Sequence, residues 1–140
     1  MMKHAISTED VEFRRALEAC ETSPAAFDHA AHVRLAYIVL CTHPLGDAAG
    51  AMKRSLLNYL AHLGIGEAKY HETITRAWIM AVQHFMENTS PCSSASDFLA
   101  ANPALLDSRI MLRHYSAEVL FSKGARRSFV PADIAPIPAH

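Results

Sequence analysis

The segment from His29 to Thr42 has apolar residues on nearly every side of a helix. His29, His32, Ala36 and Val39 recur on one side at intervals of three or four residues, and the other sides carry Val33, Leu35, Tyr37, Ile38 and Leu40. A helix that is apolar nearly all round belongs at the centre of a fold. The longest apolar run, Leu35 to Cys41, is far too short to span a bilayer. The segment therefore predicts a soluble domain built around one buried helix.

Capping residues and apolar spacing predict the other helices. Three main helices are expected from Ser7 to about Ser23, from Asp47 to Leu63 and from Tyr70 to Glu87. Shorter ones follow at 97–101, from Pro103 to about His114, and between a capping Ser116 and a terminating Gly124. The prolines of residues 129–138 predict an extended, ordered tail.

No alternating pattern indicates a strand. The expected fold is all-α: an irregular bundle of four main helices plus short C-terminal helices and an extended Pro-rich tail. We expect a single helical domain over residues 1–140, with residues 1–6 and 139–140 flexible.

The composition indicates which binding partners and which cellular location to expect. A net charge of −1 gives no electrostatic footprint for nucleic acid or an anionic membrane, so neither partner is expected. Apolar residues at 51% against charged residues at 19% indicate a large core or an apolar surface for a homo-oligomer. Three widely spaced cysteines without a secretory signal predict a cytoplasmic protein with reduced thiols.

Histidine is the unusual residue, with nine in 140. His29 and His32 lie three residues apart on one helix face, and His71 begins the apolar stripe of another helix. Three neutral imidazoles at one end of a bundle suit a divalent transition metal, of which zinc is the first choice and iron, copper or nickel are alternatives. His114 is a candidate fourth ligand. The competing interpretation is that these are ordinary core or surface histidines.

Two residues beside His71 are candidates for catalysis. Glu72 could act as a general base or as a ligand, or it could form a simple helix ion pair with Arg76. Tyr70 could donate a hydrogen bond to an oxyanion, or it could be a half-buried aromatic residue at a helix start.

The segments Phe27-Asp28-His29-Ala30-Ala31-His32 and Tyr70-His71-Glu72-Thr73-Ile74-Thr75 resemble a family of small uncharacterised bacterial helical proteins with F-x-H-x-x-H and Y-H-E-T-x-T motifs. The resemblance runs from Phe27 to Pro138 and includes an S-x-x-A-R sequence at Ser122 to Arg126. In the P-D motif of that family's tail, Ala132 here separates Pro131 from Asp133. The resemblance implies that His29, His32, His71 and Glu72 act together, but it implies no reaction.

The leading sequence-based hypothesis is a transition-metal-dependent enzyme, a hydrolase or an oxidoreductase, acting on a small molecule. One alternative is a non-catalytic helical module that binds a metal or a small ligand. Another is a helical interaction subunit without any site.

Overall fold

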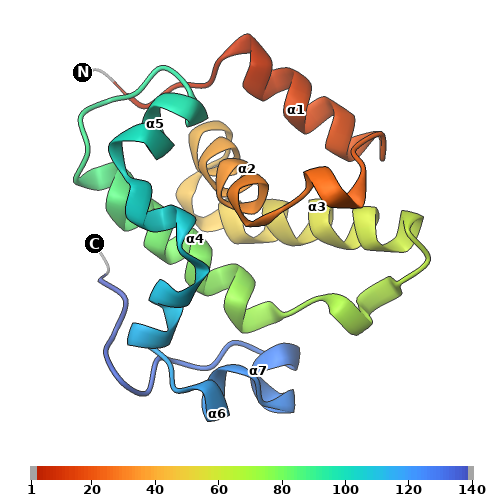
Figure 1. Cartoon of the computed structure of the whole chain (residues 1–140), viewed down its shortest axis with the longest axis vertical. Coiled ribbons are helices and arrows are strands. Elements are labelled where there is room, and N and C mark those ends of the chain that lie inside the picture. The colour runs from red at the N-terminus through yellow and green to blue at the C-terminus, as the bar shows by residue number, and fades with distance from the viewer. Residues whose placement is uncertain (1–2, 139–140) are drawn as a thin grey trace.

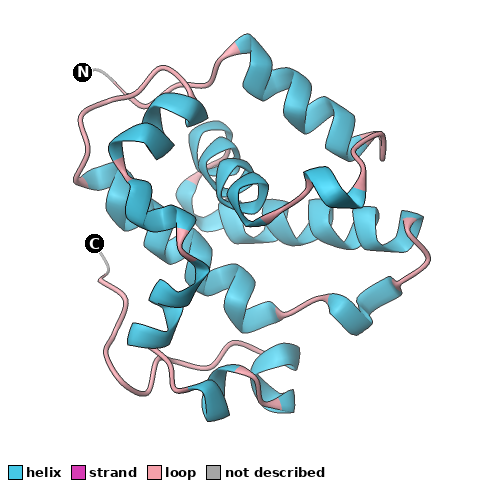
Figure 2. Ribbon diagram, in the orientation of Figure 1, coloured by secondary structure: helices cyan, strands magenta, loops and turns pink. Residues whose placement is uncertain are grey.

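The computed structural model describes residues 3–138, apart from the side chains of Leu45, Glu67 and Ala68. Within that range all regular elements are helical, as Figure 2 shows, and no strand is present. The longer helices are α1 (Thr8–Glu18), α2 (His29–Thr42), α3 (Ala48–His62), α4 (Glu72–Glu87) and α5 (Ala95–Ala101). Two short ones follow, α6 (Ala117–Leu120) and α7 (Lys123–Arg127). The predicted all-α fold is confirmed, and no described helix has the length and apolar character needed to cross a membrane.

Helix α2 occupies the centre of the molecule. Figure 1 shows it enclosed by α1, α3, α4 and α5, and it packs against all four. Its residues from Leu35 to Val39 are each no more than 1% exposed. Because apolar residues on every side of this helix need cover, the surrounding helices have to pack around it.

Local signals in the sequence set where several helices begin and end. The Asp28 carboxylate accepts a hydrogen bond from Ala31 N–H at 2.9 Å and caps α2, as predicted. After α3, Gly64 adopts the left-handed conformation with φ of 77°, which only glycine adopts without strain. Helix α1 ends at Glu18, earlier than the predicted Ser23, because Cys20 has turned to φ of 61°.

The predicted helix from Pro103 to His114 is wrong. Two 3₁₀ helices, Pro103–Leu106 and Ser108–Arg113, occupy this region. The Asp107 side chain accepts the N–H of Arg109 and starts the second of them, which breaks the run. Gly124 was expected to stop the helix that Ser116 caps, but it lies inside α7, where Ser122 provides a new cap.

The C-terminal segment folds back to pack against α4 and against residues 114–120. The Tyr115 hydroxyl donates to Val130 O at 2.6 Å, and the backbone N–H of Ile134 donates to His114 O at 2.9 Å. Ile137 is 6% exposed within a second, smaller core that includes Tyr115 and Leu120. This core lies beside the main one and forms one wall of the site described below.

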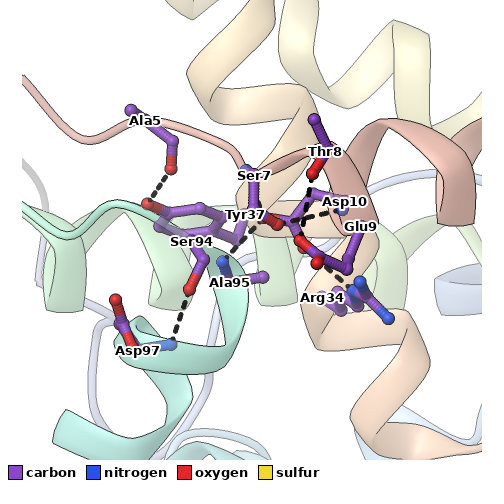
Figure 3. A network of polar contacts seen from close by, with 10 residues as sticks. All are labelled: Ala5, Ser7, Thr8, Glu9, Asp10, Arg34, Tyr37, Ser94, Ala95 and Asp97. Carbon is purple, nitrogen blue, oxygen red and sulfur yellow. Dashed lines mark hydrogen bonds and ion pairs between the residues drawn. The ribbon is translucent and has the colours of Figure 1, made fainter.

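A polar network around Asp10, drawn in Figure 3, connects α1, α2 and α5. The buried Asp10 carboxylate accepts hydrogen bonds from the backbone N–H groups of Ser7 and Ala95 and from the Arg34 guanidinium. It thereby joins the starts of α1 and α5 to the middle of α2. Burial alone would raise the pKa of Asp10, but the two N–H groups and Arg34 outweigh it and hold the pKa below its usual range.

Residues 1–6 are expected to be flexible, and the structure describes residues 3–6, where Ala5 forms hydrogen bonds with distant segments. Ala5 N–H donates to Cys92 O at 2.8 Å, and the Tyr37 hydroxyl donates to Ala5 O at 2.6 Å. Residues 1–2 and 139–140, also expected to be flexible, lie outside the described residues.

Candidate functional site

The aromatic residue and two histidines of the F-x-H-x-x-H segment lie at the start of α2. The His32 ring stacks on Phe27 with centroids 4.0 Å apart, and its Nδ1 donates to Asp28 O at 2.8 Å. A carbonyl only accepts, so Nδ1 carries the proton and the neutral ring keeps a lone pair on Nε2. Burial is the main cause that lowers the pKa of His32, so the neutral form prevails at pH 7.

The second ring nitrogen of His32, Nε2, is not fully buried. No fully buried polar side-chain atom among the described residues lacks a hydrogen-bond partner. His32 Nε2 has no hydrogen-bond partner among those residues, so it keeps contact with solvent, and His32 lines both of the cavities described below. His29 has the opposite tautomer: its Nε2 donates to Leu105 O at 2.9 Å, which leaves Nδ1 unprotonated. Its ring meets the Trp78 indole edge-on, with centroids 4.7 Å apart.

His71 is a capping residue with both ring nitrogens in use. Its Nδ1 accepts the backbone N–H of Ile74 at 3.1 Å, and its Nε2 donates to Leu120 O at 2.7 Å. The first bond needs an unprotonated Nδ1, so the ring is neutral. Burial lowers the pKa of His71 and keeps it so. In this arrangement neither nitrogen has a lone pair left for a metal.

The two threonines of the Y-H-E-T-x-T segment also form hydrogen bonds at the start of α4. Thr73 Oγ1 donates to Ser128 O at 2.9 Å and accepts the N–H of Val130 at 3.1 Å. Thr75 Oγ1 donates to His71 O at 2.8 Å, inside the first turn of α4. The bond from His71 to Leu120 and the two bonds of Thr73 form what we call the clamp. The clamp holds the C-terminal segment, from Leu120 to Val130, against the start of α4.

The two candidate catalytic residues contact each other. The Tyr70 hydroxyl donates to Glu72 Oε1 at 3.0 Å, and burial is the main cause that raises the pKa of Tyr70. Glu72 also pairs with Lys53 Nζ at 3.3 Å. The alternative pairing of Glu72 with Arg76 does not form, since the Arg76 guanidinium lies over the Phe129 ring at 4.5 Å.

Two adjacent cavities lie between α2, α3, α4 and the segment 108–126. The first has a volume of about 550 Å³, and its walls include His29, Val33, Met52, Trp78, Met111 and Leu112. The second, of about 460 Å³, includes Tyr59, Leu60, Lys69, Tyr70, His71 and Arg126. Six residues line both and form what we call the shared wall: Phe27, His32, Leu56, Ile74, Thr75 and Phe121.

The structure brings only some of the predicted metal ligands together. His32 lines both cavities, whereas His29 lines only the first and His71 only the second. His114 lines neither, and its Nδ1 donates to Ala135 O at 2.9 Å. Among the described side chains, no group of three His, Cys, Asp or Glu residues is placed to hold a metal ion. The histidines therefore do not fit a shared ligand set in this arrangement.

Glu72 likewise lies outside both cavities, although Tyr70 lines the second. Three residues of the site were not singled out from the sequence, namely Phe121, Lys69 and Arg126. Phe121 is 62% exposed although it belongs to the shared wall. The spacing of residues in the sequence does not predict that Phe121 lines the site. Phe121 lies there because the clamp bonds its neighbour Leu120 to His71.

A further depression of about 690 Å³ lies around the start of α1 and the outer face of α2. Its walls include three alanines and the exposed Glu9 and Ser96, and its Arg34 already pairs with Asp10. It offers less apolar contact than the first cavity at the shared wall.

Comparison of the chain with protein-family models, with curated proteins and with solved structures finds no significant match. Function is therefore inferred from the cavities and the residues that line them.

Proposed function

We propose that this protein is a helical binding module for a small, largely apolar molecule, held at the shared wall between α2, α3 and α4. The observation that carries the proposal is the cavity of about 550 Å³ with aliphatic and aromatic walls. Binding sites for small molecules have volumes of roughly 300–1,000 Å³, mostly apolar walls and a few polar groups.

Two features of the shared wall support the proposal. Phe121 leaves much of its ring in water, and a bound apolar molecule would cover it. His32 Nε2 is a hydrogen-bond acceptor in a fixed tautomer, since Asp28 O holds the proton on Nδ1. An apolar surface with an oriented acceptor can select a ligand that carries a hydrogen-bond donor.

A metal-dependent enzyme, the leading sequence-based hypothesis, has less support. It requires His29, His32 and His71 to bind one ion. Both ring nitrogens of His71, however, are hydrogen-bonded, one to Ile74 N–H and the other to Leu120 O. Glu72, the expected base, interacts with Lys53 and Tyr70. No metal is therefore included in the proposal.

The proposal keeps the cytoplasmic location expected from the sequence. Its support is that Cys20, Cys41 and Cys92 are all free thiols, as is usual in a reducing compartment.

Binding can be tested with the neutral fluorescent probe N-phenyl-1-naphthylamine, which brightens in apolar sites. We expect saturable binding to the wild type and a Kd raised about tenfold in Phe121→Ser, because burial of an aromatic ring contributes roughly 1.5–3 kcal/mol. Ile134→Ser is the matched control, since Ile134 is 58% exposed and lines neither cavity. Lack of saturation in the wild type, or equal effects of the two substitutions, would contradict the proposal.

A further inference from the structure

Two residues at the start of α2, His29 and His32, line the first cavity, and each keeps one unprotonated ring nitrogen. Their hydrogen bonds to Leu105 O and Asp28 O fix opposite tautomers, which leave lone pairs on His29 Nδ1 and His32 Nε2. Neither nitrogen has a hydrogen-bond partner among the described residues, so neither is fully buried. The start of α2 therefore offers two hydrogen-bond acceptors on residues that line the cavity.

The charges around the first cavity do not favour an anion. Among the described side chains that line it, Asp28 is the one carboxylate and Arg109 the one cation. The Arg109 guanidinium is already paired with the Asp107 carboxylate at 3.0 Å. A carboxylate ligand would therefore meet the Asp28 charge and the lone pairs of both histidines. Transfer of a charged group of either sign from water into apolar surroundings is also costly, so a neutral donor group is favoured.

The walls of the same cavity suit an aromatic ring. Phe27, Trp78 and Phe121 all line it, together with aliphatic side chains. Aromatic rings pair by offset stacking or edge-to-face contact, which adds to the free energy gained by burying their surface. A hydroxyl on an aromatic ring has a pKa of about 10, so at neutral pH it keeps its proton, carries no charge and can donate.

We propose that the ligand is a neutral phenol, with its ring against the aromatic walls of the first cavity and its hydroxyl donating to His32 Nε2. This inference rests on the proposed function, and it adds the class of ligand. His32 is favoured over His29 as the acceptor because it belongs to the shared wall, whereas the His29 ring already contacts Trp78. The bond from His32 Nδ1 to Asp28 O holds the tautomer that the phenol requires.

The test compares 1-naphthol with 1-methoxynaphthalene, which has the same rings and the same oxygen but no proton to donate. Each is titrated against bound N-phenyl-1-naphthylamine at pH 7.5, and the affinity of the probe is measured separately for each variant. We expect the wild type to bind 1-naphthol about fivefold more tightly than the ether, through one additional hydrogen bond. His32→Phe keeps an aromatic ring beside Phe27 but has no acceptor, so it should bind the two compounds equally.

His62→Phe is the matched control, because His62 is exposed and lines neither cavity. It should keep the wild-type preference for 1-naphthol, and circular dichroism checks that both variants are folded. The wild type gives a second measurement that needs no variant, the ¹⁵N resonance of His32 Nε2. This resonance should move further on addition of 1-naphthol than on addition of 1-methoxynaphthalene.

Equal affinity of the wild type for 1-naphthol and its methyl ether would overturn the phenol inference and leave the proposed function standing. An unchanged preference in folded His32→Phe would also overturn it. Tighter binding of 1-naphthoate, an anion, or of 1-naphthylmethylamine, a cation at this pH, would overturn the neutral class of ligand. Failure of the probe and of both naphthalene compounds to bind would overturn the proposed function itself.

Discussion

Asp10 and His71 are both buried titratable side chains at helix starts, and each joins segments far apart in the sequence. Asp10 is charged, and its carboxylate is satisfied by two backbone N–H groups and Arg34. His71 is neutral, and its two ring nitrogens link Ile74 to Leu120 beside a cavity. Similar hydrogen-bonding chemistry thus joins helices around Asp10 and, around His71, frames the cavity of the proposed binding site.

The largest expected effect is on stability, at the Asp10 junction. Asp10→Ala removes the acceptor of two backbone N–H groups and leaves Arg34 unpaired. Urea denaturation should show a loss of about 3 kcal/mol in the free energy of unfolding, the lower end for breaking a buried ion pair, because Arg34 keeps partial access to water. The folded fraction should bind N-phenyl-1-naphthylamine as the wild type does. A large rise in Kd would contradict the purely structural role assigned to Asp10.

At the other junction, His71→Ala should cost about 1–2 kcal/mol in the free energy of unfolding, through loss of the cap of α4 and of the bond to Leu120 O. His71→Asn should lose less, since an asparagine side chain also accepts the Ile74 N–H. Thermal or urea denaturation of the pair checks this. Equal losses in the two variants would show that capping is not what His71 contributes.

The pKa values of His32 and His71 are both lowered, mainly by burial, which predicts acid sensitivity. In the unfolded chain a histidine titrates near pH 6.5, so the unfolded state binds more protons once the pH falls below that value. The free energy of unfolding should therefore fall between pH 7.5 and 5, by at most about 1.4 kcal/mol per pH unit for each proton difference. The same range lies above the lowered pKa of Asp10, which should keep its charge.

Urea denaturation at both ends of this pH range, with His71→Asn beside the wild type, separates the two histidines. The variant should show a shallower loss than the wild type, while the exposed His62→Asn serves as the control. A wild-type stability that stays constant, or rises, on acidification would contradict the neutral, hydrogen-bonded state assigned to His71.

The smallest effect is expected for Glu72→Gln. The Glu72 carboxylate meets Lys53, whose side chain is 47% exposed, and such partly exposed pairs contribute about 0.2–1 kcal/mol. Glutamine can still accept from the Tyr70 hydroxyl, so the free energy of unfolding should change by less than about 1 kcal/mol, with no change in probe binding. A weaker affinity of Glu72→Gln for the probe would show that Glu72 contributes to binding.

The features that were predicted correctly depend on neighbours in the sequence. Helix α2 runs from His29 to Thr42 as expected, because Asp28 caps its start and Pro44 follows its end. The site depends on contacts between distant residues. His71 bonds to a carbonyl 49 positions away, and that contact turns a plausible metal ligand into a cap. The position of Phe121 has the same origin, so neither the cavities nor the roles of the histidines could be predicted from spacing.

The central claim is that a small apolar molecule binds at the shared wall and not near Asp10. Nuclear magnetic resonance of the ¹⁵N-labelled protein, titrated with N-phenyl-1-naphthylamine, tests it most directly. The account predicts saturable shifts of the backbone amides of His32, Thr75 and Phe121, with those of Asp10 and Ala95 unmoved. Shifts centred on Asp10 and Ala95, or no shifts at the highest soluble concentration of the probe, would contradict it.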